Sequence, residues 1–215
     1  MHETDPAKIV SDGYNRIAHR FAQWMAEEVV DEPRARYLET LLSLLPDGSR
    51  VLDLGCGGGG PTTRALVRHY RYTGVDISSG QIRLARQNIP NGVFVEGDMT
   101  RMDFPPGSFD GIAAFYSLTH LPQGELPGLL RKIARWLAPG GVFLASLSSG
   151  HNPGEFDPNW LGAPMYFSGY SPDENTEFIK AAGLSLRTAQ IETIYENGKP
   201  IHFFWVVTQK LNSDL

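Results

Sequence analysis

The sequence predicts an α/β fold in which helices cover both faces of a mostly parallel β-sheet. Between residues 50 and 147, short apolar strands alternate with helical stretches, which implies parallel pairing through right-handed crossovers. The chain ends in two β-rich runs around Asn197-Gly198, a strong hairpin signal, so the sheet should finish in an antiparallel pair at one edge. The 215 residues, 41% hydrophobic and 20% charged, fit one globular domain with a continuous core.

Two helices are expected before the first strand of this alternation. Apolar and aromatic residues recur at three- and four-residue spacing over residues 11–30, as on one face of a helix. A shorter helix is expected at 34–45, before Pro46-Asp47-Gly48. The aromatic residues Tyr14, Phe21 and Trp24 of the first helix either pack in the core or form a lid over a ligand.

The alternating region and the end of the chain complete the expected elements. Strands are expected at 50–54, 71–75, 93–96, 109–115 and 142–147, and helices at 61–69, 79–88 and 123–137. Residues 148–170 have no clear periodicity and predict a long connection of the kind that is functional or mobile. A helix at 172–182 then precedes the hairpin strands at 184–195 and 201–209.

Composition excludes several classes of protein. The formal net charge of −5 argues against broad binding to a nucleic-acid backbone. A single cysteine, Cys56, excludes an internal disulfide framework, and no pair of histidines or carboxylates shows metal-ligand spacing, so no metal is expected. The N-terminus lacks the features of a signal peptide and no stretch reaches 18 apolar residues. A cytoplasmic protein without a membrane segment is therefore expected.

The strand at 50–54 leads into a loop of nearly pure glycine, from Gly55 to Gly60. Glycine reaches positive φ and has no Cβ, so a ligand can approach this backbone closely. Asp53 precedes the loop by two residues, and the first basic residue after it is Arg64. A pyrophosphate would meet an acidic group there, whereas the sulfonium and ammonium groups of S-adenosylmethionine are cations. The charges favour the sulfonium cofactor.

Two further acidic residues stand at strand ends. Asp76 ends the second strand, where a carboxylate can accept both ribose hydroxyls of an NAD or an S-adenosylmethionine molecule. Asp98 follows the third strand and could accept from the adenine amino group while Met99 packs on the base. An NAD domain does not ordinarily require this third position. The three carboxylates together predict a cationic ligand that carries adenosine.

Five segments resemble the motifs of class I S-adenosylmethionine-dependent methyltransferases of the small-molecule type, in that family's order and spacing. They are residues 51–59, 74–78, 97–99, 109–115 and 137–144. The resemblance implies a Rossmann-like, seven-stranded, mostly parallel sheet whose last strand is inserted antiparallel. It also implies one methyltransferase domain over 1–215, with N-terminal lid helices (1–46), a cofactor-binding core (47–147), and an acceptor-side connection with the C-terminal hairpin (148–215).

These motifs give a set of candidate site residues. The cofactor candidates are Asp53, Gly55, Cys56, Gly57, Asp76, Ile77, Asp98, Met99 and Phe115. The substrate and lid candidates are Tyr14, Phe21, Tyr116, Trp160 and Tyr166. Cys56 is expected to pack in the loop rather than to act as a nucleophile. His120 follows the fourth strand and is the one catalytic candidate, with a structural or substrate-shaping role as the alternative.

The expected reaction is transfer of the cofactor's methyl group to an oxygen, nitrogen or carbon of a small, planar or apolar molecule, with S-adenosylhomocysteine as product. Positioning supplies much of the catalysis of an in-line displacement, so no residue here must be catalytic. A nucleic-acid methyltransferase is disfavoured because Phe115-Tyr116-Ser117-Leu118 stands where amino-directed enzymes carry an (Asp/Asn/Ser)-Pro-Pro-aromatic motif. A non-catalytic cofactor-binding module stays open, and either a monomer or a homodimer is expected.

Overall fold

A computed structural model describes residues 5–211, and the outermost residues at each end (1–4 and 212–215) lie outside it. Eight strands form one sheet in the order β1-β9-β10-β6-β5-β2-β3-β4. Its strands are β1 (Val29–Val30), β2 (Arg50–Leu54), β3 (Arg71–Asp76), β4 (Val93–Glu96), β5 (Phe109–Ala114), β6 (Leu137–Ser148), β9 (Leu184–Glu196) and β10 (Lys199–Lys210). β2 to β6 pair in parallel, while β10 lies antiparallel between β6 and β9. The predicted fold class is confirmed.

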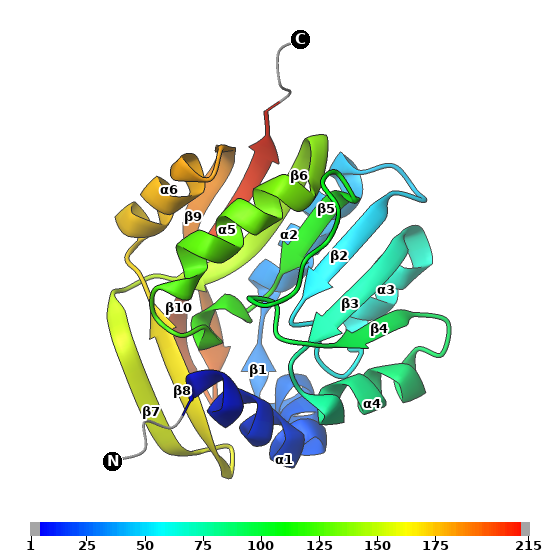
Figure 1. Cartoon of the computed structure of the whole chain (residues 1–215). Helices are drawn as coiled ribbons and strands as arrows, with labels where there is room; N and C mark the ends of the chain where they lie inside the picture. The colour runs from blue at the N-terminus through cyan, green and yellow to red at the C-terminus, as the bar shows by residue number, and fades with distance from the viewer. Residues whose placement is uncertain (1–4, 212–215) are drawn as a thin grey trace.

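One strand more than expected belongs to this sheet. The two residues of β1 pair with Tyr195 and Glu196 at the end of β9. A pair of valines between two helices is too short to show strand alternation, so the sequence pattern does not reveal it. The expected seven strands are therefore joined by an eighth, which ties the N-terminal segment to the tip of the C-terminal hairpin (Figure 1).

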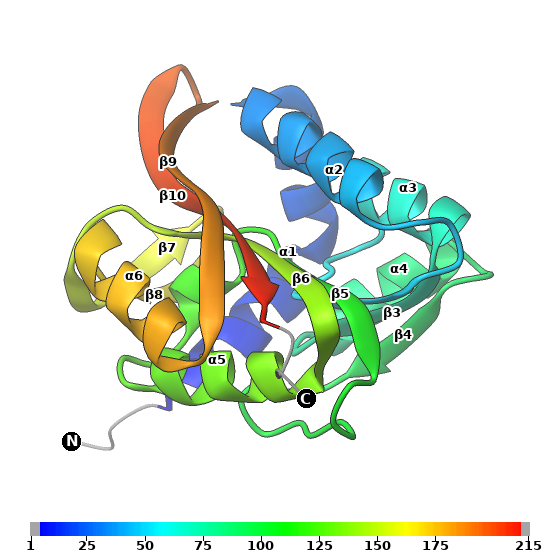
Figure 2. The ribbon, with the colours of Figure 1, turned by 90° about the horizontal axis from the view of Figure 1, so that it is seen from above.

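The helices lie on both faces of the sheet (Figure 2). They are α1 (Pro6–Glu27), α2 (Glu32–Leu44), α3 (Pro61–His69), α4 (Ser79–Asn88), α5 (Glu125–Trp136) and α6 (Pro172–Ala181), with a short 3-10 helix η1 (Leu118–His120). Side chains alternate along the central strands. Leu52 and Leu54 of β2 belong to the core under α5 and α6, whereas Val51 belongs to the core under α2, α3 and α4.

The first helices differ in role. α1 begins at Pro6, five residues earlier than expected, because Asp5 caps it by accepting from the Ala7 N–H at 3.0 Å. α2 packs Tyr37 and Leu41 into the sheet core. Of the two helices expected as lids, α1 borders the cavity described below along much of its length, while α2 covers the sheet and contributes only its first turn to the cavity.

The long connection is not the irregular segment that its sequence suggests. Residues 152–169 form a separate antiparallel hairpin of β7 (Asn152–Trp160) and β8 (Ala163–Gly169). Its register shifts twice, and Gly154 has φ of +142°, so prolines, glycines and irregular pairing obscure the alternation of a strand. This correction matters for the site, because β8 packs against α1 through a small core of its own that includes Ile17 and Met165.

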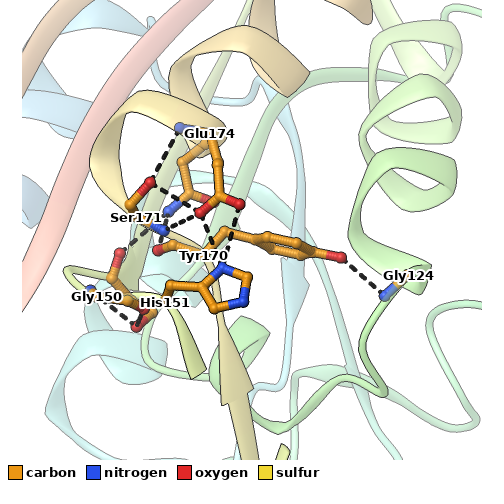
Figure 3. A network of polar contacts seen from close by, with 8 residues as sticks. Gly124, Gly150, His151, Tyr170, Ser171 and Glu174 are labelled. Carbon is orange, nitrogen blue, oxygen red and sulfur yellow. Dashed lines mark hydrogen bonds and ion pairs between the residues drawn. The ribbon is translucent and has the colours of Figure 1, made fainter. Parts of the chain in front are cut away.

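Polar contacts fasten the start of this hairpin to α6 (Figure 3). His151 Nδ1 lies 3.1 Å from both carboxylate oxygens of Glu174. Glu174 also accepts from the Ser171 N–H and forms the capping box that begins α6. The Gly124 N–H donates to the Tyr170 hydroxyl at 2.9 Å, so the segment after the hairpin is attached to the loop before α5 as well.

Candidate cofactor and acceptor site

The chain reverses direction across the sheet between β2 and β5, and ligands of open α/β sheets bind at the carboxyl ends of strands at such a point. A cavity of about 510 Å³ lies there. That volume falls within the usual range for small-molecule sites. The glycine loop after β2, the loop after β5, α1, the first turn of α2 and the tip of the β9–β10 hairpin all contribute to its wall.

The glycine loop turns because three of its glycines have positive φ, at Gly55, Gly57 and Gly59. At Gly55 a Cβ would lie 2.2 Å from Ser117 Cβ, so the loops after β2 and β5 are in contact there. A Cβ on Gly57 would meet nothing within 4 Å, so that part of the loop is open. The bare backbone therefore serves two purposes: close packing of loops at Gly55 and an open surface at Gly57.

Asp76 is held at the cavity wall by the backbone. Its two carboxylate oxygens accept from the Gly57 N–H and the Ser78 N–H, each at 2.9 Å. Burial raises the pKa of Asp76 to about 6, although both backbone bonds oppose that shift. The carboxylate keeps lone pairs toward the cavity that a pair of hydroxyls could use.

α1 is fixed over this loop by specific hydrogen bonds. Asn15 Oδ1 accepts from the Ser78 hydroxyl at 2.9 Å and from the Gly80 N–H at 2.8 Å. The Ser11 hydroxyl donates to the Ile77 carbonyl at 3.1 Å. These contacts place the helix directly beside the predicted ribose position, which supports its interpretation as a lid.

Some of the remaining cofactor candidates line the cavity, and others are buried beneath it. Ile77, Asp98, Met99 and Phe115 line the cavity. Asp98 Oδ1 already accepts from the Thr100 N–H at 2.9 Å and from the Thr100 hydroxyl at 2.7 Å. Because a carboxylate has about four acceptor sites, Asp98 retains capacity for a ligand's amino group.

Asp53 and Cys56 lie deeper. Asp53 does not line the cavity; its carboxylate is buried and accepts from the Tyr72 hydroxyl at 2.8 Å. Burial raises the pKa of Asp53 to about 6. Cys56 borders the cavity but is buried, and burial raises the pKa of its thiol well above the ordinary value. A thiol in that state is a packing group rather than a nucleophile.

Aromatic side chains form a second region of the cavity, which we call the acceptor lobe. Its aromatic walls are Tyr14, Phe21, Trp24, Trp160 and Phe167. Their ring centroids lie 5.2 to 5.9 Å apart for pairs such as Tyr14–Phe21 and Phe21–Trp160. Of the predicted substrate residues, Tyr166 is the one that does not line the cavity, and it contributes its backbone carbonyl to His120 instead.

His120 lies behind Tyr14. Its Nδ1 is 2.9 Å from the Tyr166 carbonyl, which can only accept, so Nδ1 carries the proton and donates. Nε2 then accepts from the Tyr14 hydroxyl at 2.8 Å. Burial lowers the pKa of His120 to about 4, so the ring is neutral near pH 7. His120 also borders the cavity, where the Tyr14 hydroxyl covers its Nε2, and its catalytic role stays a prediction.

Tyr14→Phe should lower the free energy of unfolding by about 1 kcal/mol, because the partly buried His120 Nε2 would lose its hydrogen-bond donor. Urea denaturation of the protein at pH 7 measures this loss. Tyr166→Phe is the matched control, since His120 contacts only the backbone of Tyr166, and it should leave the urea midpoint unchanged. Equal losses in the two variants would contradict the assigned hydrogen bond.

Three further charged residues of the cavity were not predicted from the sequence. Asp31 and Arg34, at the start of α2, and Glu196, at the end of β9, line the acceptor lobe. Arg34 Nε donates to Asp31 Oδ2 at 2.7 Å, and the guanidinium lies 4.7 Å from the centre of the Tyr116 ring. In the sequence, Asp31-Glu32-Pro33 shows only the signal of a helix start. The structure confirms that α2 begins there, with Asp31 as its N-cap.

Gln81 was missed as well. Its side chain is 1% exposed and borders the cavity, and neither its amide oxygen nor its nitrogen has a hydrogen-bond partner among the described residues. Buried amides are ordinarily satisfied, so this one indicates a polar group supplied from outside the chain. The open glycine loop, the free lone pairs of Asp76 and this amide together fit an adenosine-bearing ligand.

The sheet order, the antiparallel last strand and the glycine loop with its acidic strand ends agree with the Rossmann-like fold that the motif resemblance implies. The comparisons agree: residues 51–141 match the family model described as a methyltransferase domain. Residues 51–141 of this chain are therefore similar to a methyltransferase domain.

Curated relatives share mainly this central region. A sterol 24-C-methyltransferase of Gibberella zeae is 34% identical over 142 residues, which are 61% of this chain and 36% of that protein. A fatty-acid O-methyltransferase of Mycolicibacterium smegmatis is 39% identical over 103 residues, 46% of this chain and 36% of that protein. The matches thus span about a third of these relatives' length.

A solved structure extends the likeness in fold to nearly the whole chain. The Burkholderia thailandensis 1,6-didemethyltoxoflavin-N1-methyltransferase, with its substrate and S-adenosylhomocysteine bound, superposes with a TM-score of 0.71 at 21% identity. The alignment covers 96% of this chain and 89% of that one. At this identity the likeness concerns the fold alone.

Proposed function

We propose that this protein transfers the methyl group of S-adenosylmethionine to an oxygen, nitrogen or carbon atom of a small, planar or apolar molecule. The observation that carries the proposal is one cavity that joins the Asp76 and glycine-loop surface to an aromatic lobe. The three relatives named above are a carbon, an oxygen and a nitrogen methyltransferase of small molecules by their names, which supports the substrate class.

Residues of this chain have distinct parts in holding the cofactor. Asp76 would accept the ribose hydroxyls, and Asp98 with Met99 would bind the adenine. Arg34 would bind the carboxylate of the amino-acid end, since its two terminal nitrogens have no hydrogen-bond partner within residues 5–211 while Asp31 fixes the guanidinium from the other side. The cofactor, when bound, supplies an electrophilic methyl group on a sulfonium.

The chain would promote the reaction chiefly by positioning. The acceptor lobe would hold the acceptor molecule behind the methyl group and exclude water from it. Where the accepting group carries a proton, the Tyr14 hydroxyl oxygen is placed to accept a hydrogen bond from it, because its own proton is donated to His120. Near pH 7 the neutral His120 would take that proton only transiently.

Binding and turnover test this function separately. Calorimetry with S-adenosylhomocysteine should give a dissociation constant on the order of micromolar, at the lower end of the usual KM values of enzymes. Methyl-labelled cofactor with a panel of aromatic and apolar acceptors should then give labelled product. Binding without turnover on any acceptor would favour the non-catalytic module, and retention on heparin at low salt would favour the nucleic-acid alternative. Failure to bind the cofactor product would contradict the proposal altogether.

The surroundings of the protein remain predictions. None of the helices within residues 5–211 is long and apolar enough to cross a membrane. The same residues contain no group of three or more metal-ligating side chains. A small-molecule acceptor as the principal partner, a cytoplasmic location and a monomer or homodimer continue to be our expectations.

A further inference from the structure

One charged side chain of the acceptor lobe has no partner in the protein. Glu196 ends β9, is partly buried and borders the cavity. Within residues 5–211 its carboxylate has neither a hydrogen bond nor an ion pair, and burial together with the charge of Asp31 raises its pKa. By contrast Glu192, four residues earlier on β9, forms an ion pair with Arg36 at 2.8 Å and does not border the cavity.

The backbone holds Glu196 in place. Val29 of β1 pairs with Glu196 of β9, and the Asn197 N–H donates to the Glu28 carbonyl at 3.0 Å. A two-residue turn at Asn197 and Gly198, both with positive φ, then leads into β10. The carboxylate is thus carried by a strand that is paired on both sides rather than by a free loop.

The nearby charged residues do not neutralise the carboxylate of Glu196. Arg34 is the cation of the acceptor lobe, and its Nε is bound to Asp31. Asp31 in turn accepts from the Arg34 N–H and the Tyr116 hydroxyl through Oδ1 and from Arg34 Nε through Oδ2. A partly buried carboxylate without a partner is unfavourable unless a ligand brings the opposite charge.

We propose that Glu196 binds a positively charged amine of the acceptor, so that the substrate of this site is a flat or apolar amine. The inference rests on the proposed function, which defines the acceptor lobe. The rings of Phe21, Trp24 and Trp160 would take the apolar body, and aromatic faces themselves attract cations. The amine is a handle for recognition, and the methyl group goes to another atom of the same molecule.

Three probes with the same bicyclic ring test this inference: 2-naphthylmethylamine, 2-naphthalenemethanol and 2-naphthoate. Each is titrated into the full chain saturated with S-adenosylhomocysteine, with tryptophan fluorescence and calorimetry as readouts, since Trp24 and Trp160 line the lobe. The amine should bind about tenfold more tightly than the alcohol, and the carboxylate most weakly. Glu196→Gln should weaken amine binding about tenfold and leave alcohol binding within about twofold.

Glu192→Gln is the control, because it removes the same charge from the same strand outside the cavity, and it should keep the preference for the amine. Glu196→Gln should also bind S-adenosylhomocysteine as the wild type does. The inference is overturned if the carboxylate binds the wild type as tightly as the amine, if Glu196→Gln weakens all three probes equally, or if none of them binds. Failure of the wild type to bind S-adenosylhomocysteine would instead overturn the proposed function, and this inference with it.

Discussion

Asp76→Asn should weaken the binding of S-adenosylhomocysteine by about a hundredfold. Hydrogen bonds to a charged group contribute about 1.5 to 3 kcal/mol each, and about 1.4 kcal/mol is a factor of ten in affinity. The substitution replaces one acceptor oxygen with an amide group that donates. That group would also face the Gly57 or the Ser78 N–H, which now donate to the carboxylate. Calorimetry at pH 7.5 measures the loss.

The affinity of the wild type should also depend on pH in a defined direction. Burial raises the pKa of Asp76 to about 6, so the carboxylate is charged above that pH and becomes neutral as the pH falls through it. Cofactor affinity should therefore be constant above pH 6 and decline below it, by up to about tenfold per pH unit. Without cofactor, the contribution of Asp76 to the free energy of unfolding increases as the pH falls from about 6 to 3.8. The reason is that its raised pKa makes the folded state bind the proton more tightly than the unfolded state does.

Asp53→Asn is the matched control for Asp76→Asn. Burial raises the pKa of Asp53 to about 6 as well, but its carboxylate is bound to Tyr72 away from the cavity. Its variant should bind S-adenosylhomocysteine within about threefold of the wild type. A hundredfold loss in Asp53→Asn, or undiminished binding by Asp76→Asn, would contradict the assignment of the ribose position.

Gly55→Ala should lower the free energy of unfolding by about 3 kcal/mol or more and abolish cofactor binding. Gly55 has φ of +79°, a conformation that costs a residue with a side chain about 1 to 2 kcal/mol. The added Cβ would lie 2.2 Å from Ser117 Cβ, and relieving this overlap costs about a further 1 to 3 kcal/mol. Any movement of Ser117 also strains the bond from its hydroxyl to the Leu54 carbonyl, which is 2.6 Å long. Urea denaturation without cofactor measures the effect.

Gly57→Ala separates strain from overlap. Its φ of +59° is equally unfavourable, yet an added Cβ meets no atom within 4 Å, so the expected loss is only about 1 to 2 kcal/mol. Adding Ser117→Gly to Gly55→Ala removes the Cβ that causes the overlap and should recover part of the stability. Equal urea midpoints for Gly55→Ala and Gly57→Ala would show that contact between the two loops is unimportant.

The central fold was predictable because its information is local. β2, β3 and β4 are short strands that end at a glycine or an acidic residue, and the apolar runs of β5 and β6 follow them in order in the sequence. The position of Asp76 and Asp98 at the cavity follows from their place at strand ends, since parallel strands end at one edge of the sheet.

The acceptor lobe was less predictable because its residues meet only in three dimensions. Arg34 and Glu196 are 162 positions apart in the sequence and share one cavity. The β7–β8 hairpin was missed because its register shifts remove the alternation that would reveal a strand. Asp53 shows the opposite case: its position beside the glycine loop suggested a cofactor contact, but strand alternation turns the carboxylate to Tyr72.

The place of β10 between β6 and β9 has a consequence for how the protein is made. β10 leaves the ribosome after the other strands of this sheet, yet it pairs with both neighbours and joins β9 to the rest of the sheet. The motifs assigned to the cofactor are complete in the nascent chain once residue 147 has emerged, whereas β9, which carries Glu196, is joined to β6 only through β10. During synthesis the loops that we assign to the cofactor can therefore form before the strand that carries Glu196 is in place.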